Sequence, residues 1–212
     1  MIYILVRTSN RPKYFKRCIE SIKAQVVDEQ VRVIIGNDDP FNDYIRDYPE
    51  VSMTILNLER DNSYDIDKTH CIDTAKYFPY NGYLNKMLQQ CTEQGWVMIL
   101  DDDDFFSSKF ALQRVTQQLK SDTQMAFLRV SICGNIIPSD KNWGKHPVLR
   151  DMSMIGFMFH TKYIPLLHVA PYKQADYRLA AQLYDLCEPV FINEILTTTD
   201  NEGQGRQMDC TI

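Results

Sequence analysis

The stretch Trp96-Val97-Met98-Ile99-Leu100-Asp101-Asp102-Asp103-Asp104 decides how this chain folds. Five apolar residues end abruptly in four carboxylates, a pattern typical of a core strand that carries charge at its C-terminal end. Adjacent carboxylates repel one another, so the run itself gives the fold no stability. A divalent cation would relieve the repulsion, and carboxylate oxygens suit Mg²⁺ or Mn²⁺. The stretch predicts a metal-assisted site for a phosphorylated substrate, with a solvated acidic loop as the alternative.

Composition and charge set the broad class of the chain. Its 212 residues are 44% hydrophobic, which suits one domain over residues 1–212. The net charge of -5 gives no support for general nucleic-acid binding. No stretch approaches the roughly 20 apolar residues of a membrane span, and the N-terminal run lacks the marks of a signal peptide. We therefore expect a cytoplasmic protein without a membrane span, or one domain of a longer multidomain protein.

Strands and helices alternate along the chain. The pattern in the first half predicts four strands, at residues 2–6, 31–35, 52–56 and 96–100. It also predicts two helices, at residues 12–24 and 83–91. This alternation predicts an α/β fold with a mainly parallel, doubly wound sheet and helices on both faces. The second half is less regular, with strands expected at 125–132, 154–159 and 190–196 and helices at 107–119 and 174–186. It predicts a smaller mixed or antiparallel extension.

Polar residues follow three of the predicted strands. Asp38-Asp39 comes after the second strand, Asp101–Asp104 after the fourth, and Thr8-Ser9-Asn10-Arg11 after the first. The carboxyl ends of parallel strands lie on one edge of a sheet, where ligands bind. One acid pair could accept hydrogen bonds from a nucleobase and ribose, while another holds a metal on a diphosphate. The polar stretch 58–74 predicts a loop near this edge.

Four parts of the chain together resemble the GT-A glycosyltransferases, particularly the family 2-like inverting enzymes. The matching parts are Ile4-Leu5-Val6-Arg7-Thr8-Ser9-Asn10-Arg11-Pro12, then Ile34-Ile35-Gly36-Asn37-Asp38-Asp39-Pro40, then Asn85-Lys86 through Gly95 to Asp104, and finally Gly156-Phe157-Met158-Phe159 with Ala175-Asp176-Tyr177-Arg178-Leu179-Ala180. The resemblance implies a GT-A fold with a nucleotide-binding half at about 1–104 and an acceptor-binding half at about 105–212.

The resemblance implies donor-binding roles for residues near the predicted edge. Asp38 would contact uracil, with Asp39 as a substitute. Asp101 would contact the ribose and Arg11 the diphosphate. The implied donor site also includes Thr8, Asn85 and Asp102.

The resemblance also implies a metal ligand and a base. Asp103 would coordinate Mn²⁺ or Mg²⁺, although the frame that starts at Asp102 stays open. Asp176 aligns with the general base, but Ala175 stands where the family has an acid, and an N-cap is the alternative role for Asp176. Trp143 either stacks on an acceptor sugar or anchors local packing.

The activity implied by the resemblance is transfer of a hexose from a UDP-sugar donor to a hydroxyl of a glycan acceptor, with inversion. A sugar-phosphate nucleotidyltransferase is one alternative, but residues 7–12 lack the Gly-rich phosphate loop usual in such enzymes. A nucleotide- or cation-binding module without catalysis is another, which Ala175 leaves open.

Overall fold

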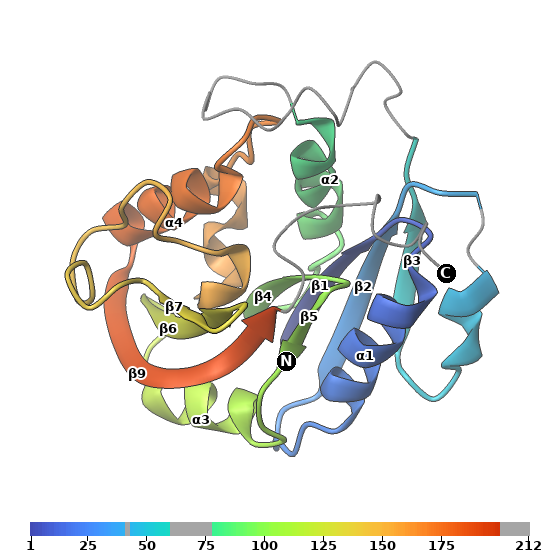
Figure 1. Cartoon of the computed structure of the whole chain (residues 1–212), viewed down its shortest axis with the longest axis horizontal. Coiled ribbons are helices and arrows are strands. Elements are labelled where there is room, and N and C mark those ends of the chain that lie inside the picture. The colour runs from blue at the N-terminus through green and yellow to red at the C-terminus, as the bar shows by residue number, and fades with distance from the viewer. Residues whose placement is uncertain (41–42, 60–77, 200–212) are drawn as a thin grey trace.

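The computed structural model describes residues 1–40, 43–59 and 78–199, which form a nine-stranded sheet with helices on both faces (Figure 1). The strand order is β3-β2-β1-β4-β8-β6-β9-β5, and β7 pairs with β6. The strands are β1 (Ile2–Thr8), β2 (Val31–Asn37), β3 (Met53–Asn57), β4 (Trp96–Asp101), β5 (Asp104–Phe106), β6 (Gln124–Ile132), β7 (Asn135–Ile137), β8 (Phe157–His160) and β9 (Glu188–Thr199). The α-helices are α1 (Pro12–Lys23), α2 (Pro79–Leu88), α3 (Ala111–Gln118) and α4 (Ala175–Leu186), and the 3₁₀ helices are η1 (Asp43–Asp47), η3 (Met154–Gly156) and η4 (Thr161–Leu166).

The first half of the sheet is parallel, as predicted. β1 lies between β2 and β4 and pairs in parallel with both, and β3 pairs in parallel with β2. The register sets Thr8 beside Asn37 and Arg7 beside Asp101. The carboxyl ends of three strands therefore share one edge, and their polar residues meet there.

The second half of the sheet is mixed, which confirms the predicted extension. β8 runs antiparallel to both β4 and β6, whereas β9 runs parallel to β6. The long strand β9 curves across the lower left of Figure 1 and ends beside β5, with which it pairs antiparallel. β9 thus closes the sheet back onto Asp104, the last aspartate of the run, and the two residues after it.

Two local predictions in this half differ from the structure. Strand β5 forms at Asp104–Phe106, where no strand was predicted. The prediction missed it because its pairing partner, Thr197–Thr199, is remote in the chain. Helix α3 begins at Ala111 and not at 107 or 108. The Ser108 hydroxyl accepts a bond from the Phe110 N–H, so it closes a turn before the helix and does not cap it.

Alternate residues of β1 pack on opposite faces of the sheet. Ile2, Ile4 and Val6 join a buried cluster with residues of α1 and α3. Tyr3 and Leu5 join a second buried cluster with residues of α2 and α4. This period-two pattern is what a strand between two helical layers requires, and it confirms helices on both faces. No helix in the described ranges has the length and apolar character needed to cross a membrane.

Helix α2 lies over the edge where the polar residues meet. It begins at Pro79, four residues before the predicted start, and proline suits the first turn of a helix. Gly36 of β2 permits its close approach, since a Cβ at this position would lie 2.6 Å from Met87 Sδ. The loop predicted at 58–74, which precedes this helix, lies outside the described residues except for 58 and 59.

Gly95→Ala should lower the free energy of unfolding by about 1–3 kcal/mol, the usual cost of overpacking. A Cβ on Gly95 would lie 2.4 Å from the Met1 carbonyl oxygen, which accepts a bond from the Trp96 N–H. Urea unfolding measures the change. Gly82→Ala is the matched control, because its Cβ would meet Pro171 at 3.5 Å and alanine favours the helix by up to about 1 kcal/mol. Equal stability of Gly95→Ala and the wild type would contradict this packing.

Candidate active site

The four aspartates form a buried turn, here called the acid turn (Asp101–Asp104). Asp101 ends β4, Asp104 begins β5, and the two residues between them make the turn. Asp102, Asp103 and Asp104 are 0%, 5% and 6% exposed. The alternative of a solvated acidic loop is therefore wrong. Because unpaired buried carboxylates are costly, the partners of these acids hold the site together.

Arg7 binds both carboxylate oxygens of Asp101 with two of its three guanidinium nitrogens. Its Nε donates to Asp101 Oδ1 at 2.7 Å and its Nη2 donates to Oδ2 at 2.9 Å. Its Nη1 donates to Asn81 Oδ1 at 2.8 Å, and its guanidinium lies over the Tyr80 ring. Arg7 was not among the predicted site residues. The signal was available, because aligning the starts of β1 and β4 pairs Arg7 with Asp101.

Thr8 and Arg11 hold the middle of the acid turn. The Thr8 hydroxyl donates to Asp102 Oδ2 at 2.7 Å. Arg11 Nη2 donates to Asp102 Oδ1 and also to Asp103 Oδ1, the second at 3.1 Å. The structure thus brings Thr8 and Arg11 together with the acid turn, which contains the predicted acids Asp101, Asp102 and Asp103. Both Asp102 oxygens bond within the protein and the residue is fully buried, so its side chain braces the turn.

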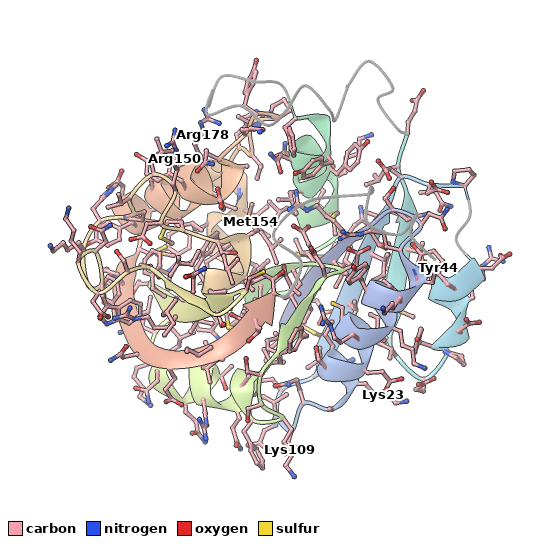
Figure 2. The ribbon with its side chains drawn as sticks, in the orientation of Figure 1. Lys23, Tyr44, Lys109, Arg150, Met154 and Arg178 are labelled. Atoms are coloured by element: carbon pink, nitrogen blue, oxygen red, sulfur yellow. The ribbon has the colours of Figure 1, made fainter. Side chains whose placement is uncertain are left out.

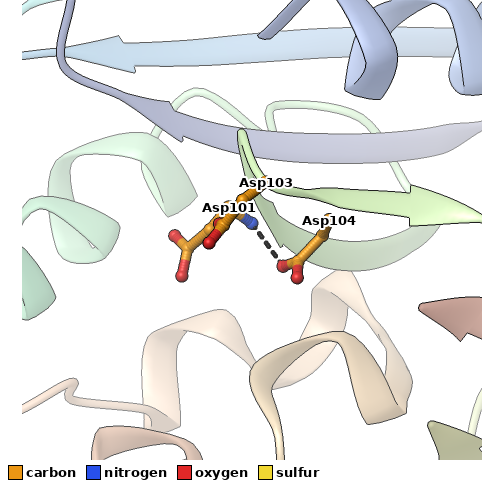
Figure 3. A group of neighbouring side chains, drawn as sticks. All are labelled: Asp101, Asp103 and Asp104. Carbon is orange, nitrogen blue, oxygen red and sulfur yellow. Dashed lines mark hydrogen bonds between the residues drawn. The ribbon is translucent and has the colours of Figure 1, made fainter. Parts of the chain in front are cut away.

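Three carboxylates of the acid turn could hold a metal ion. One oxygen each from Asp101, Asp103 and Asp104 lies within 4.8 Å of the others (Figure 3). Asp104, which only the open frame starting at Asp102 included in the prediction, accepts a bond at its Oδ2 from the Asp101 N–H at 2.7 Å. Burial raises the pKa of Asp103 and the pKa of Asp104, and the neighbouring carboxylates raise both further, while the charge of Arg11 acts against the rise for Asp103 and the charge of Arg7 against the rise for Asp104. An all-oxygen set with this excess of negative charge fits Mg²⁺ or Mn²⁺.

Asp38 and Asp39 lie buried at the end of β2. The Tyr83 hydroxyl of α2 donates to Asp38 Oδ2 at 3.2 Å, a contact that the sequence did not predict. Tyr44, labelled in Figure 2, brings its hydroxyl within 2.8 Å of Thr8 Oγ1. Hydroxyl groups from α2 and η1 therefore line the edge beside the predicted nucleoside contacts.

Asn85 links α2 to the segment that leads into α4. Its Nδ2 donates to the Val169 carbonyl at 2.8 Å, and its Oδ1 accepts from the Val169 N–H at 2.9 Å. Asn81 Nδ2 similarly donates to the Tyr172 carbonyl at 2.8 Å. Asn85 was predicted to contact the donor, but both ends of its amide bond the backbone of Val169. The side chain instead braces the approach to Asp176.

Asp176 lies in the first turn of α4. The N-cap of this helix is Gln174, so the alternative of Asp176 as N-cap is wrong. The Tyr177 N–H donates to Asp176 Oδ1 at 2.8 Å. Burial raises the pKa of Asp176 to about 6, although the bond from Tyr177 and the charge of Arg7 act against this rise. The charge of Asp101 also raises this pKa. Helix α4, which carries Asp176, packs in the same buried cluster as Leu5 of β1 and Ile99 of β4, so Asp176 lies on the face of the sheet that this cluster covers.

Trp143 packs within its own loop and against β6 and β9. The Arg129 guanidinium lies 4.4 Å from the centre of its ring, and the Phe191 ring meets it edge-on at 5.4 Å. Arg129 also donates to Asp140 and to the Pro138 carbonyl. These contacts favour the packing anchor over the acceptor contact for Trp143.

The sheet, its helical layers and the acid turn define the GT-A fold of nucleotide-sugar glycosyltransferases. The chain belongs to glycosyl transferase family 2, because the model of that family matches residues 3–165, more than half of its length. Both findings confirm the fold and the family that the sequence indicated. A comparison with curated protein sequences gives no match.

Solved structures with this fold include two kinds of glycosyltransferase. S. aureus TarS 1-349 in complex with UDP-GlcNAc is 13% identical, with a TM-score of 0.65 over 100% of this chain and 61% of that one. The mannosyltransferase PcManGT from Pyrobaculum calidifontis, in complex with GDP-Man and Mn²⁺, is 13% identical, with a TM-score of 0.65 over 96% and 58%. At these identities the similarity concerns the fold. The chain spans about 60% of the length of these structures.

Asp176→Asn should raise the free energy of unfolding at neutral pH by about 1 kcal/mol. The folded pKa of about 6 exceeds the ordinary value of 3.8. Between these values the folded protein keeps a proton that the unfolded chain releases, so stability falls as the pH rises through this window. A shift of two pKa units corresponds to about 3 kcal/mol, which partial exposure and the lost interaction with the helix N-terminus reduce.

Urea unfolding at a series of pH values checks this expectation. The difference between Asp176→Asn and the wild type should disappear below about pH 4, where the carboxyl is protonated in both states. A variant that is less stable than the wild type at neutral pH would show that burial of Asp176 carries no cost.

Proposed function

We propose that this chain transfers a hexose from a UDP-sugar to a hydroxyl group of a glycan, with inversion and with the help of Mn²⁺ or Mg²⁺. The proposal rests on the acid turn at the strand edge, which is buried apart from Asp101, and on helix α4, which carries Asp176 and packs in the same cluster as Leu5 and Ile99 of the adjoining strands. Membership of glycosyl transferase family 2 supports glycosyl transfer. The complexes of structural neighbours with UDP-GlcNAc and with GDP-Man and Mn²⁺ support a nucleotide-sugar donor and a divalent cation.

The donor would lie along the shared edge of β2, β1 and β4. A carboxylate at Asp38 suits the N–H of a uracil ring, and the Tyr83 hydroxyl that bonds it would hold it in place. Asp101, fixed by Arg7, would accept hydrogen bonds from the ribose hydroxyls. Arg11, at the start of α1, would meet the diphosphate, for which a guanidinium is well suited.

Asp103 would hold the divalent cation, with Asp101 and Asp104 as the nearest further carboxylates. When bound, such a cation acts as a Lewis acid that stabilises the charge developing on the leaving diphosphate. The protein's own contribution is to keep these oxygens close together despite their repulsion. Arg7, Arg11 and the backbone N–H of Asp101 perform that task.

Asp176 would act as general base. The acceptor oxygen forms a bond to the anomeric carbon on the face opposite the diphosphate, the bond from that carbon to the diphosphate breaks, and the acceptor proton passes to the Asp176 carboxylate. Attack from the opposite face inverts the anomeric configuration. A pKa of about 6 makes this carboxylate a stronger base than an exposed aspartate, while it stays mostly ionised at neutral pH.

Calorimetric titration with UDP tests the donor site. We expect UDP to bind in the presence of Mn²⁺ and at least about tenfold more weakly in EDTA, since a shared cation couples the two ligands. Asp103→Asn should lose the dependence on Mn²⁺. Asp140→Asn removes a carboxylate that is 97% exposed and should bind like the wild type. Absence of UDP and GDP binding by folded protein would contradict the proposal, whereas preference for GDP would replace only the donor.

Release of UDP from a panel of UDP-sugars, with glycan acceptors, tests the chemistry at the same site. Asp176→Asn should keep its affinity for UDP and lose roughly 100-fold or more in turnover, the usual contribution of a general base. A wild-type protein that binds UDP with Mn²⁺ but turns over no UDP- or GDP-sugar would instead be a nucleotide-binding module.

A further inference from the structure

Arg11 serves two carboxylates with one nitrogen atom. Its Nη2 donates to Asp102 Oδ1 and to Asp103 Oδ1, while its guanidinium lies 5.3 Å from the centre of the Tyr14 ring. The residue is 8% exposed and directly precedes α1. Asn10, before it, has a φ of 51°, a left-handed conformation that asparagine tolerates. The turn at the end of β1 thus directs a buried cation at the acid turn.

The two bonds from Arg11 are unequal. Asp102 is fully buried and has Thr8 as its other partner, so loss of Arg11 would leave its charge poorly compensated. Asp103 is bonded at 3.1 Å, which exceeds the 2.7–2.9 Å that is usual for a bond between two charged groups. The contact with Asp103 is long for two charged groups, and Asp103 belongs to the candidate cation cluster, so this contact is the one that a cation can replace.

We propose that Arg11 is an exchangeable counter-ion, which neutralises Asp103 in the cation-free protein and releases it when Asp103 binds a divalent cation. Arg11 keeps its bond to Asp102 and turns its remaining N–H groups to the donor diphosphate. The inference rests on the proposed function and adds to it what Arg11 binds before and after the cation arrives. A bound cation releases Arg11 from Asp103 and so frees its N–H groups for the diphosphate, and a bound diphosphate draws Arg11 away from Asp103. Each ligand therefore strengthens the binding of the other.

If Arg11 exchanges Asp103 for the diphosphate, the substitution Arg11→Met should change the affinities for Mn²⁺ and for UDP in opposite directions. Mn²⁺ alone should bind more tightly, by roughly tenfold, because no guanidinium competes for Asp103. UDP in the presence of Mn²⁺ should bind more weakly, by roughly tenfold or more, because a charge-assisted bond to the diphosphate is lost. Electron paramagnetic resonance of free Mn²⁺ measures the first affinity and calorimetry measures the second.

Lys13→Met is the matched control for loss of one positive charge. Lys13 lies exposed in the first turn of α1, next but one to Arg11 in sequence. Solvent and salt screen its charge, so we expect both affinities to change by less than about threefold. An Arg11→Met variant that weakens both ligands, or alters neither, would overturn the exchange and leave the proposed function standing. Absence of Mn²⁺ and UDP binding in the wild type would overturn both.

A measurement on the wild-type protein covers the case in which Arg11→Met does not fold. Nitrogen-15 NMR follows the Nε–H signals of arginine side chains as Mg²⁺ is added, with Arg11→Lys to assign the signal of Arg11. The signal of Arg11 should move, and it should not move in Asp103→Asn. Arg129, whose Nε donates to Asn193 Oδ1 away from the acid turn, provides a reference. Mg²⁺ binding without any change at Arg11 would overturn the exchange.

Discussion

Burial of three carboxylates in a run of four adjacent aspartates is the constraint on which the rest of this structure depends. Removing charged groups from water costs several kcal/mol each unless partners compensate, and these four also repel one another. The compensation comes from separate elements: Arg7 from β1, Arg11 from the start of α1, Thr8 from the end of β1 and the backbone of the turn itself. The parallel register of β1 with β4 makes this possible, because it places these partners at the level where β4 ends.

The same arrangement that is costly for folding is useful for binding a cation and a diphosphate. Carboxylates held close together against their repulsion gain from a divalent ion, and the arginines that hold them suit phosphate oxygens. Helix α2 extends the arrangement, since it bonds Asp38 through Tyr83 and the approach to α4 through Asn81 and Asn85. The helix thus connects the residues proposed for the donor with the segment before Asp176.

Features that depend on local sequence were predictable, and features that depend on remote partners were not. The apolar runs predict the strands β1, β2 and β4, and the polar residues at the ends of these runs predict the shared edge. Strand β5 was missed because three residues become a strand only beside the end of β9, nearly 100 residues away. Arg7 was missed because its partner Asp101 lies on another strand and is recognised only when the starts of β1 and β4 are aligned. Asp102 and Asp103 are adjacent in sequence, yet their surroundings differ. Thr8 and Arg11 bond both oxygens of Asp102, which braces the turn, whereas Asp103 is a candidate metal ligand.

The proposed function depends on binding, by the buried acid turn, of the cation that serves the donor. Anomalous X-ray scattering from crystals of this protein grown with Mn²⁺ and UDP tests it most directly. We expect one anomalous peak within about 2.2 Å of an Asp103 carboxylate oxygen, a distance typical of such ligands, with the UDP diphosphate on its other side. A peak at another group of acids, or UDP bound on the strand edge without any peak at the acid turn, would contradict it.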